Sequence, residues 1–144
     1  MNLQECVKFA TENPTCFFAT ADGNQPHVRT LLMWRANEQG FHFAILSPKA
    51  VYKQLQRNPK VEVCFFNNAS NPAEWRMMRV TGTVEVLNEP EMKKKVAEER
   101  HGLEAVINRP LEPLIEIACL HHGEAVFWTM PDALKEPELE RVKF

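Results

Sequence analysis

The chain has 144 residues, a formal net charge of −2, 44% apolar residues and 25% charged residues. This length fits a single domain, 1–144, and no apolar run approaches the ~18 residues that a membrane-spanning helix needs. The near-neutral charge argues against a nucleic-acid partner, which selects basic surfaces, and the first residues lack the pattern of a signal peptide, so we expect a cytoplasmic protein.

Four cysteines are scattered along the chain, at Cys6, Cys16, Cys64 and Cys119. A disulfide scaffold or a zinc ribbon shows compact, repeated cysteine spacings, and none occurs here. We therefore expect reduced thiols that are mostly buried.

The N-terminal third predicts one helix and three strands. Apolar residues at helical spacing place a helix within 1–13, and it ends at Asn13-Pro14 because a residue before proline avoids helical geometry. Strands are expected at 15–20, 27–34 and 41–46. The cluster Asp22-Gly23-Asn24 predicts a hairpin turn between the first two strands.

Ser47-Pro48 predicts the start of a second helix, with Ser47 as its N-cap, which ends at Asn58-Pro59. Further strands are expected at 61–66 and 75–87, with a bulge at Gly82, and two final strands around residues 121–123. Asn88 is expected to cap a helix over 90–101, and the charged tail, 131–144, to be frayed. Short strands, tight turns and few helices predict a mainly β protein with flanking helices, built as a closed antiparallel barrel.

The most informative side chains are cations near the predicted start of the second helix. Lys49 would lie in the first turn, where the helix dipole disfavours a cation by some tenths of a kcal/mol unless an anion binds there. Backbone N–H groups, the Ser47 hydroxyl and the Arg29 guanidinium together suit one phosphate group. Lys53 is as readily explained as a solvated lysine.

Apolar strand ends near that helix suit the flat ring of a cofactor: Met33, Trp34, Ile45 and Leu46. Residue type alone favours the simpler interpretation, in which they form barrel core. Trp75 and Arg79 fit a contact with a dimer mate and a solvated strand edge equally well.

Other motifs are weaker. His121-His122 is interpreted as a turn rather than a metal site, because adjacent strand residues point to opposite faces. Dinucleotide-binding, P-loop and nucleophile-elbow motifs do not occur, so the pattern of residues alone leads to a phosphate-binding barrel.

Five segments in register resemble the pyridoxamine 5′-phosphate oxidase-like, FMN-binding split-barrel family. They are FATADG at 18–23, PHVR at 26–29, VYKQL at 51–55, NPKVEV at 58–63 and RVTGTV at 79–84. The similarity extends from about Val7 to Trp128. It implies a Greek-key split barrel and a homodimer that holds two FMN molecules between its subunits.

The resemblance also implies roles for individual residues. Arg29, with Thr30 beside it, resembles the arginine that reaches the FMN phosphate or ribityl chain, and Lys49 falls in a basic stretch that holds phosphate. Ile45 and Leu46 stand where many members carry hydroxyl residues that bind the cofactor. Met77 stands where true pyridoxamine 5′-phosphate oxidases carry a glutamine. The arginine-histidine motif that these enzymes have near the C-terminus is absent from this chain. Oxidation of vitamin B6 is therefore not expected.

Three functions follow as hypotheses. The first is an FMN-dependent oxidoreductase that acts on a small, flat substrate, in which the cofactor supplies the chemistry. The second is a binding protein that sequesters a flavin, a deazaflavin or haem without turnover, which the missing hydroxyls at Ile45 and Leu46 favour. The third is a structural dimer with a vestigial pocket.

Overall fold

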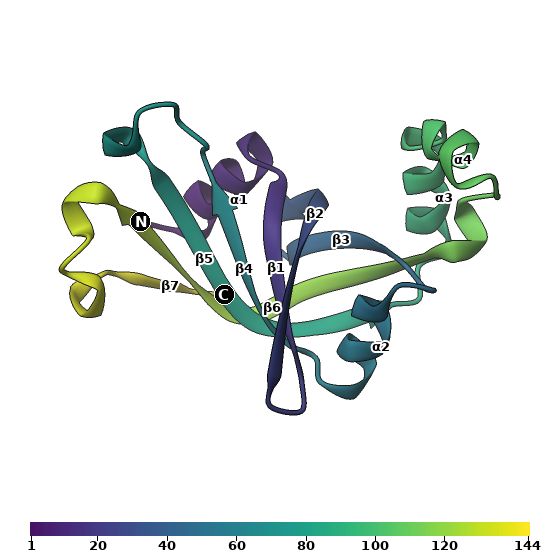
Figure 1. Cartoon of the computed structure of the whole chain (residues 1–144), viewed down its shortest axis with the longest axis horizontal. Coiled ribbons are helices and arrows are strands. Elements are labelled where there is room, and N and C mark those ends of the chain that lie inside the picture. The colour runs from purple at the N-terminus through teal and green to yellow at the C-terminus, as the bar shows by residue number, and fades with distance from the viewer.

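The computed structural model describes residues 1–144 and centres on a closed antiparallel barrel (Figure 1). Its strands are β1 (Thr15–Asp22), β2 (Gln25–Asn37), β3 (Gly40–Leu46), β4 (Lys60–Phe66), β5 (Arg76–Leu87) and β6 (Ile115–Thr129). They lie in the order β3-β2-β1-β4-β5-β6, and pairing of β3 with β6 closes the barrel. The fourth strand returns beside the first of three consecutive strands, which is the Greek-key arrangement. The expected fold class is therefore confirmed.

The first hairpin forms where the sequence predicts it. Asp22 pairs with Gln25, so only Gly23 and Asn24 form the loop, and Gly23 adopts φ +60°, which a glycine tolerates without strain. β2 is longer than expected at both ends. It begins at Gln25, which pairs with Asp22, and after a bulge between Met33 and Arg35 it continues beside β3 to Asn37.

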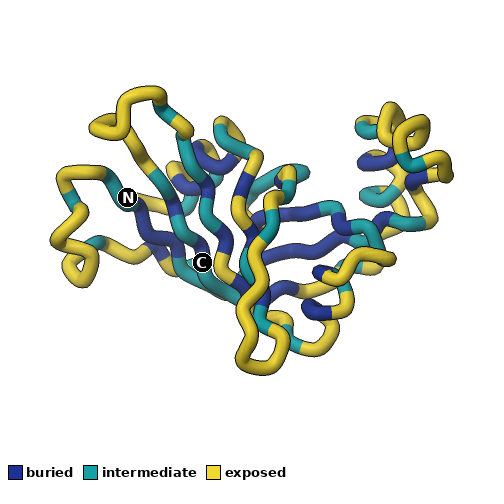
Figure 2. The backbone as a smooth tube through the Cα atoms, in the orientation of Figure 1, coloured by how far each residue is buried: buried dark blue, intermediate teal, exposed yellow.

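The core fills the barrel with aromatic side chains that alternate along the strands. Phe18 and Phe43 are fully buried, and their rings meet edge to face with centroids 5.0 Å apart. Helix α1 (Leu3–Glu12) covers one end of the barrel, where Phe9 packs against Phe127 at 5.3 Å. Figure 2 shows the buried residues running through the strands, whereas the tip of the β1–β2 hairpin is exposed.

Helix α2 (Ala50–Arg57) begins later than expected, and its N-cap is Lys49 rather than Ser47. The backbone N–H of Ser47 donates to the carbonyl of Leu114 at 2.8 Å, which holds Ser47 beside the segment that leads into β6. The N–H of Lys49 then closes a turn on the carbonyl of Leu46. A bond to a distant segment thus delays the helix by two residues.

Helices α3 (Pro90–Glu99) and α4 (Gly102–Ile107) lie at one end of the molecule (Figure 1). The N-cap of α3 is Glu89, not the expected Asn88, and α4 was not predicted. Asn108 ends α4 in the left-handed conformation, at φ +55°. A small second core of Val96, Ala97, Leu111, Ile115 and Ile117 joins α3 to β6.

The expectation of two separate final strands is wrong, because the single strand β6 runs unbroken through His121-His122-Gly123. His122 adopts φ +51°, and β5 shifts register between Thr81 and Thr83 on the opposite side. The backbones approach so closely that a Cβ on Gly123 would lie 1.9 Å from the carbonyl oxygen of Thr81. The paired irregularities bend both strands together, and the bulge expected around Gly82 is confirmed.

The tail is not frayed, contrary to expectation. β7 (Arg141–Lys143) pairs with β6 from Glu124 to Val126, and Val142 is buried. Four short 3-10 helices complete the chain: η1 (Pro72–Glu74), η2 (Glu112–Leu114), η3 (Met130–Asp132) and η4 (Glu136–Glu138). No helix has both the length and the apolar character that crossing a membrane requires.

Candidate functional site

A pocket of about 200 Å³ lies between the outer face of the barrel and the α3–α4 pair. β2 and β3 contribute Thr30, Leu32, Ala44 and Leu46, whose side chains share the outer face because alternate strand residues point the same way. Helices α3 and α4 cover the pocket with Val96 and Leu103. The result is a mainly apolar space between a rigid sheet and two short helices.

Two cations border this apolar pocket. Lys49 lines the pocket from the start of α2, and Arg100 lines it from the end of α3. The Arg100 guanidinium donates to the carbonyl of Leu32 at 3.2 Å, and burial lowers its pKa from the usual arginine value. Arg100 could not be singled out by sequence analysis, because it stands among many charged residues of a helix whose position on the barrel a sequence does not reveal. The pocket thus combines apolar walls with positive charge.

The start of α2 has features that favour the binding of an anion. Its N-cap, Lys49, makes no side-chain capping bond, and the first turn carries no acidic residue. The first N–H groups of a helix lack partners within the helix, and the dipole adds positive potential at the same point. An exposed lysine at an uncapped helix start is therefore a combination that a phosphate group would stabilise.

Arg29 lies close to this helix, but its guanidinium is already hydrogen-bonded to residues of β1 and α2. Its guanidinium donates to Thr20 Oγ1 at 2.8 Å, to Gln54 Oε1 at 2.5 Å and to the carbonyl of Phe18 at 3.3 Å. Thr20 in turn donates to Gln54 at 2.6 Å. Burial lowers the pKa of Arg29 from the usual arginine value. Arg29 therefore ties β1, β2 and α2 together, and the sequence did not predict the partners Thr20 and Gln54.

The other residues that the sequence predicted for the cofactor site lie in different parts of the structure. Ile45 and Leu46 line the pocket, although Ile45 is almost fully buried in the core. Met33 and Trp34 line a neighbouring pocket of about 450 Å³, where Trp34 Nε1 donates to Glu99 at 2.7 Å. The two pockets share Leu32 and Arg100. Ser47 is partly buried and Lys53 exposed, and neither lines the pocket.

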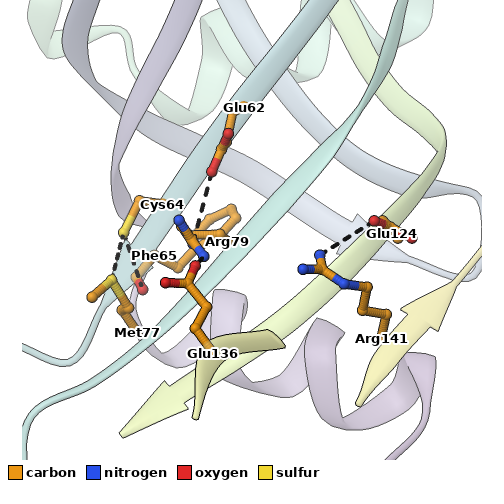
Figure 3. A network of polar contacts seen from close by, with 8 residues as sticks. All are labelled: Glu62, Cys64, Phe65, Met77, Arg79, Glu124, Glu136 and Arg141. Carbon is orange, nitrogen blue, oxygen red and sulfur yellow. Dashed lines mark hydrogen bonds and ion pairs between the residues drawn. The ribbon is translucent and has the colours of Figure 1, made fainter. Parts of the chain in front are cut away.

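Trp75 and Arg79 lie away from the pocket of their own chain. Arg79 pairs with Glu62 and Glu136, as Figure 3 shows. Arg79 and Thr30 belong to one row of paired residues across the sheet, with Cys64 and Phe17 between them. Three strand spacings, about 14 Å in total, therefore separate Arg79 from Thr30. Trp75 precedes β5, and its Nε1 donates to the carbonyl of Ala69 at 2.9 Å. Met77 contacts Cys64, with the sulfur atoms 3.6 Å apart.

The two histidines of β6 differ from the expectation that they point apart. The positive φ of His122 brings both rings into edge-to-face contact, with centroids 4.3 Å apart. His121 Nε2 also lies 2.9 Å from Glu85 Oε2. The rule of alternation fails at this point because a bulge interrupts the strand.

Comparison with known proteins gives one related enzyme. Over 74 residues the chain is 40% identical to a pyridoxine/pyridoxamine 5′-phosphate oxidase of Pseudomonas putida (strain GB-1). The match covers 51% of this chain and only 33% of the length of that relative.

Solved structures share the fold at lower identity. General stress protein 26 of Bacillus anthracis superposes with a TM-score of 0.73, at 14% identity over 99% of this chain and 98% of that one. An FAD-binding protein of Mesorhizobium loti has a TM-score of 0.61, at 18% identity over 87% and 92%. The haem storage protein HutZ of Vibrio cholerae has a TM-score of 0.62, at 17% identity over 83% and 89%.

A family model decides the assignment. The model described as pyridoxamine 5′-phosphate oxidase matches residues 3–120, from α1 to the middle of β6. This range includes β1 to β5, the first part of β6, and the pocket that β2, β3 and α2 border. The chain therefore belongs to the pyridoxamine 5′-phosphate oxidase family.

Proposed function

We propose that the protein binds FMN and acts as a flavin-dependent oxidoreductase on a small, flat substrate. The observation that carries this proposal is the apolar pocket beside the uncapped start of α2, with Lys49 belonging to both. Family membership and the related FAD-binding fold support a flavin as the ligand. Bound FMN would supply the electron transfer, and the protein would supply binding and orientation.

The residues present fit a phosphorylated flavin in two parts. Lys49 and the N–H groups at the start of α2 would hold the phosphate. Thr30, Leu32, Ala44 and Leu46 would flank the ring and exclude water from one of its faces. Because Ile45 and Leu46 carry no hydroxyl groups, backbone groups would have to bind the polar edge of the ring.

Arg29 would support the site by holding α2 in place, and not by binding the phosphate itself. Its guanidinium already donates to three acceptors, two of them on β1 and one on α2. Through Gln54 it fixes α2 against the barrel, and the position of α2 sets the position of Lys49. A group that acts through the helix in this way positions the phosphate site.

We also propose that the active form is a homodimer. The pocket, at about 200 Å³, is smaller than the usual ~300–1,000 Å³ of a small-molecule site, which indicates that one chain forms only part of it. Beside it the outer face of β1 and β2 exposes Phe17, Val28 and Leu32, at 42%, 69% and 50%. A second copy on this apolar face would bury it and complete the pocket.

Titration of cofactor-free protein with FMN and with riboflavin tests the phosphate site directly. We expect the wild-type protein to bind FMN more tightly than riboflavin, as measured by quenching of flavin fluorescence. Lys49→Ala is expected to remove most of this difference and to leave riboflavin binding unchanged. Lys8→Ala, an exposed lysine on α1, is the matched control. An unchanged preference for FMN in Lys49→Ala would refute the site.

Turnover separates the enzyme from a binding protein. We expect NAD(P)H to reduce the bound FMN and a quinone or nitroaromatic compound to reoxidise it. Pyridoxamine 5′-phosphate is expected to remain unoxidised. Tight FMN binding without turnover of any acceptor would refute the oxidoreductase and leave a flavin-binding protein.

The second candidate function is sequestration of a flavin, a deazaflavin or haem. The apolar Ile45 and Leu46 favour it, as does the shared fold with a haem storage protein. A Soret band that saturates on haem titration, together with no change on FMN titration, would support haem as the ligand. Saturable FMN binding without a haem response would exclude haem as the ligand.

A further inference from the structure

The neighbouring pocket of about 450 Å³ that Met33 and Trp34 line, here called the Trp34 pocket, has the size of a ligand site. Its volume lies within the usual ~300–1,000 Å³ of a small-molecule site, unlike that of the flavin pocket, which is the one that Lys49 borders. The two pockets share Leu32 and Arg100. A molecule in the Trp34 pocket would therefore lie beside a bound flavin.

The walls of the Trp34 pocket suit a flat ring. β2 bulges between Met33 and Arg35, and Trp34 stands at this bulge. Its Nε1 donates to Glu99 at 2.7 Å, which fixes the indole against α3. Leu32 adds an apolar wall. An aromatic side chain held in this way can pack against the ring of a ligand.

Two arginines of the Trp34 pocket have no carboxylate partner. Arg35 and Arg100 both line it, and neither forms an ion pair of the kind that Arg57 and Arg141 make. Arg100 donates to the carbonyl of Leu32 at 3.2 Å. Because a guanidinium has five N–H donors, both arginines keep donors for a ligand.

Arg35 is held in position although its hydrogen bonding is incomplete. Its guanidinium carbon lies over the Trp34 ring, 4.4 Å from the centroid, which is a cation–π contact. Its Nε is buried without a hydrogen-bond partner, whereas buried polar atoms are nearly always paired. Its cross-strand neighbour is His42, whose pKa is lowered by burial and by the Arg35 charge, so this neighbour is neutral. A negatively charged ligand would give the guanidinium the acceptor that the chain does not.

The charged residues of the Trp34 pocket leave it net positive. Glu99 is the one carboxylate that lines it, against Arg35 and Arg100, and Glu99 accepts the bond from Trp34. Burial lowers the pKa of Arg100, because surroundings with little water disfavour its charge. A ligand carboxylate would offset this cost by pairing with the guanidinium.

We propose that the Trp34 pocket is the substrate subsite beside the flavin and that the substrate is a small aromatic carboxylate. In naming a substrate, this inference rests on the proposed function. Arg35 and Arg100 would bind the carboxylate, whose geometry the planar guanidinium matches. Trp34 would pack against the ring. Leu32 and Arg100, which border both pockets, would place that ring next to the flavin.

Calorimetric titration of cofactor-free and FMN-loaded protein with 2-naphthoate and 2-naphthamide tests the preference for a carboxylate. The two probes share one ring system and differ in charge. We expect 2-naphthoate to bind at least about 10-fold more tightly than 2-naphthamide, because a hydrogen bond between charged groups is stronger than one to a neutral acceptor. Absence of 2-naphthoate binding, or equal affinity for the two probes, would overturn the proposal.

Arg35→Gln locates the site, because Arg35 lines the Trp34 pocket and not the flavin pocket. It should weaken 2-naphthoate binding about 10-fold and leave the binding of 2-naphthamide and FMN unchanged, whereas a folding defect would weaken all three. Glu99→Gln should tighten 2-naphthoate binding several-fold, because it removes the competing charge and keeps an oxygen for Trp34. Arg141→Gln, on β7, is the matched control and should bind every ligand as the wild type does.

The subsite and the flavin function can fail separately. If Arg35→Gln binds 2-naphthoate as tightly as the wild type while FMN still binds, the subsite is refuted and the flavin function stands. If the wild type prefers 2-naphthoate in an Arg35-dependent way but binds no FMN, the flavin function is refuted, and the carboxylate is then no substrate of a flavin.

Discussion

Arg29→Ala should destabilise the protein even when no cofactor is bound. The substitution removes three hydrogen bonds, to Thr20, Gln54 and the carbonyl of Phe18. A hydrogen bond from a charged donor contributes about 1.5–3 kcal/mol when buried. Arg29 is only partly buried and sheds some desolvation cost when it is removed, so we expect a total loss of about 2 kcal/mol. Thr20 and Gln54 keep the bond between themselves, which limits the loss.

Urea unfolding of cofactor-free protein, followed by tryptophan fluorescence, measures this loss. A change of about 2 kcal/mol corresponds to a decrease of about 4–8 °C in Tm for a chain of this size. Lys49→Ala should change stability by less than about 0.5 kcal/mol, or raise it, because it removes a cation from the positive end of α2. Equal stability of Arg29→Ala and wild type would refute the structural role, and Arg29 would then be a cofactor ligand only.

Three further predictions concern the bend, the thiols and the apolar face. Gly123→Ala should lower the free energy of unfolding, measured with urea, by at least about 3 kcal/mol, because the added Cβ would meet the Thr81 carbonyl. Gly102→Ala, which has open space around it, should be neutral or stabilising. Equal effects of the two substitutions would exclude the close approach at Gly123. Burial raises the pKa of Cys6 to about 11 and of Cys16 to about 12, so at pH 8 about 0.1% or less of either thiol is ionised. Ellman's reagent should therefore label neither cysteine in the native protein and both after unfolding in urea. Val28→Asp should yield a monomer in sedimentation experiments, and an unchanged dimer would place the interface elsewhere.

Local signals predicted most of the barrel. The β1–β2 hairpin was found because Gly23 carries the required turn geometry within the loop itself. The strand at β3 and the end of α2 at Asn58-Pro59 follow from alternation and from proline, which also act locally. These features need no knowledge of the rest of the chain.

The errors occur where distant segments decide the local structure. Ser47 would cap a helix, but its N–H is bound to Leu114. The bend at His122 is a bulge in which His122 and Gly123 of β6 stand opposite Gly82 alone on β5, and β7 pairs with the edge of β6 beyond this bend. A sequence pattern contains no information about these partners.

The candidate site was predicted in part for the same reason. Lys49, Thr30 and Leu46 come from neighbouring strands and a helix start, and the structure brings them to one pocket. Arg100 joins them only because α3 packs on the outer face of β6. Arg79, in contrast, is held by Glu136 from the tail, a partner that no local pattern indicated.

The pairing of β3 with β6 also sets the order in which the chain can fold. The edge of β3 finds its partner only in the last third of the chain. During synthesis at about 5–20 residues per second, that edge remains without a partner for several seconds. An open strand edge can pair with other chains, so nascent or truncated forms that end before β6 should aggregate, whereas the finished chain leaves no such edge on β3.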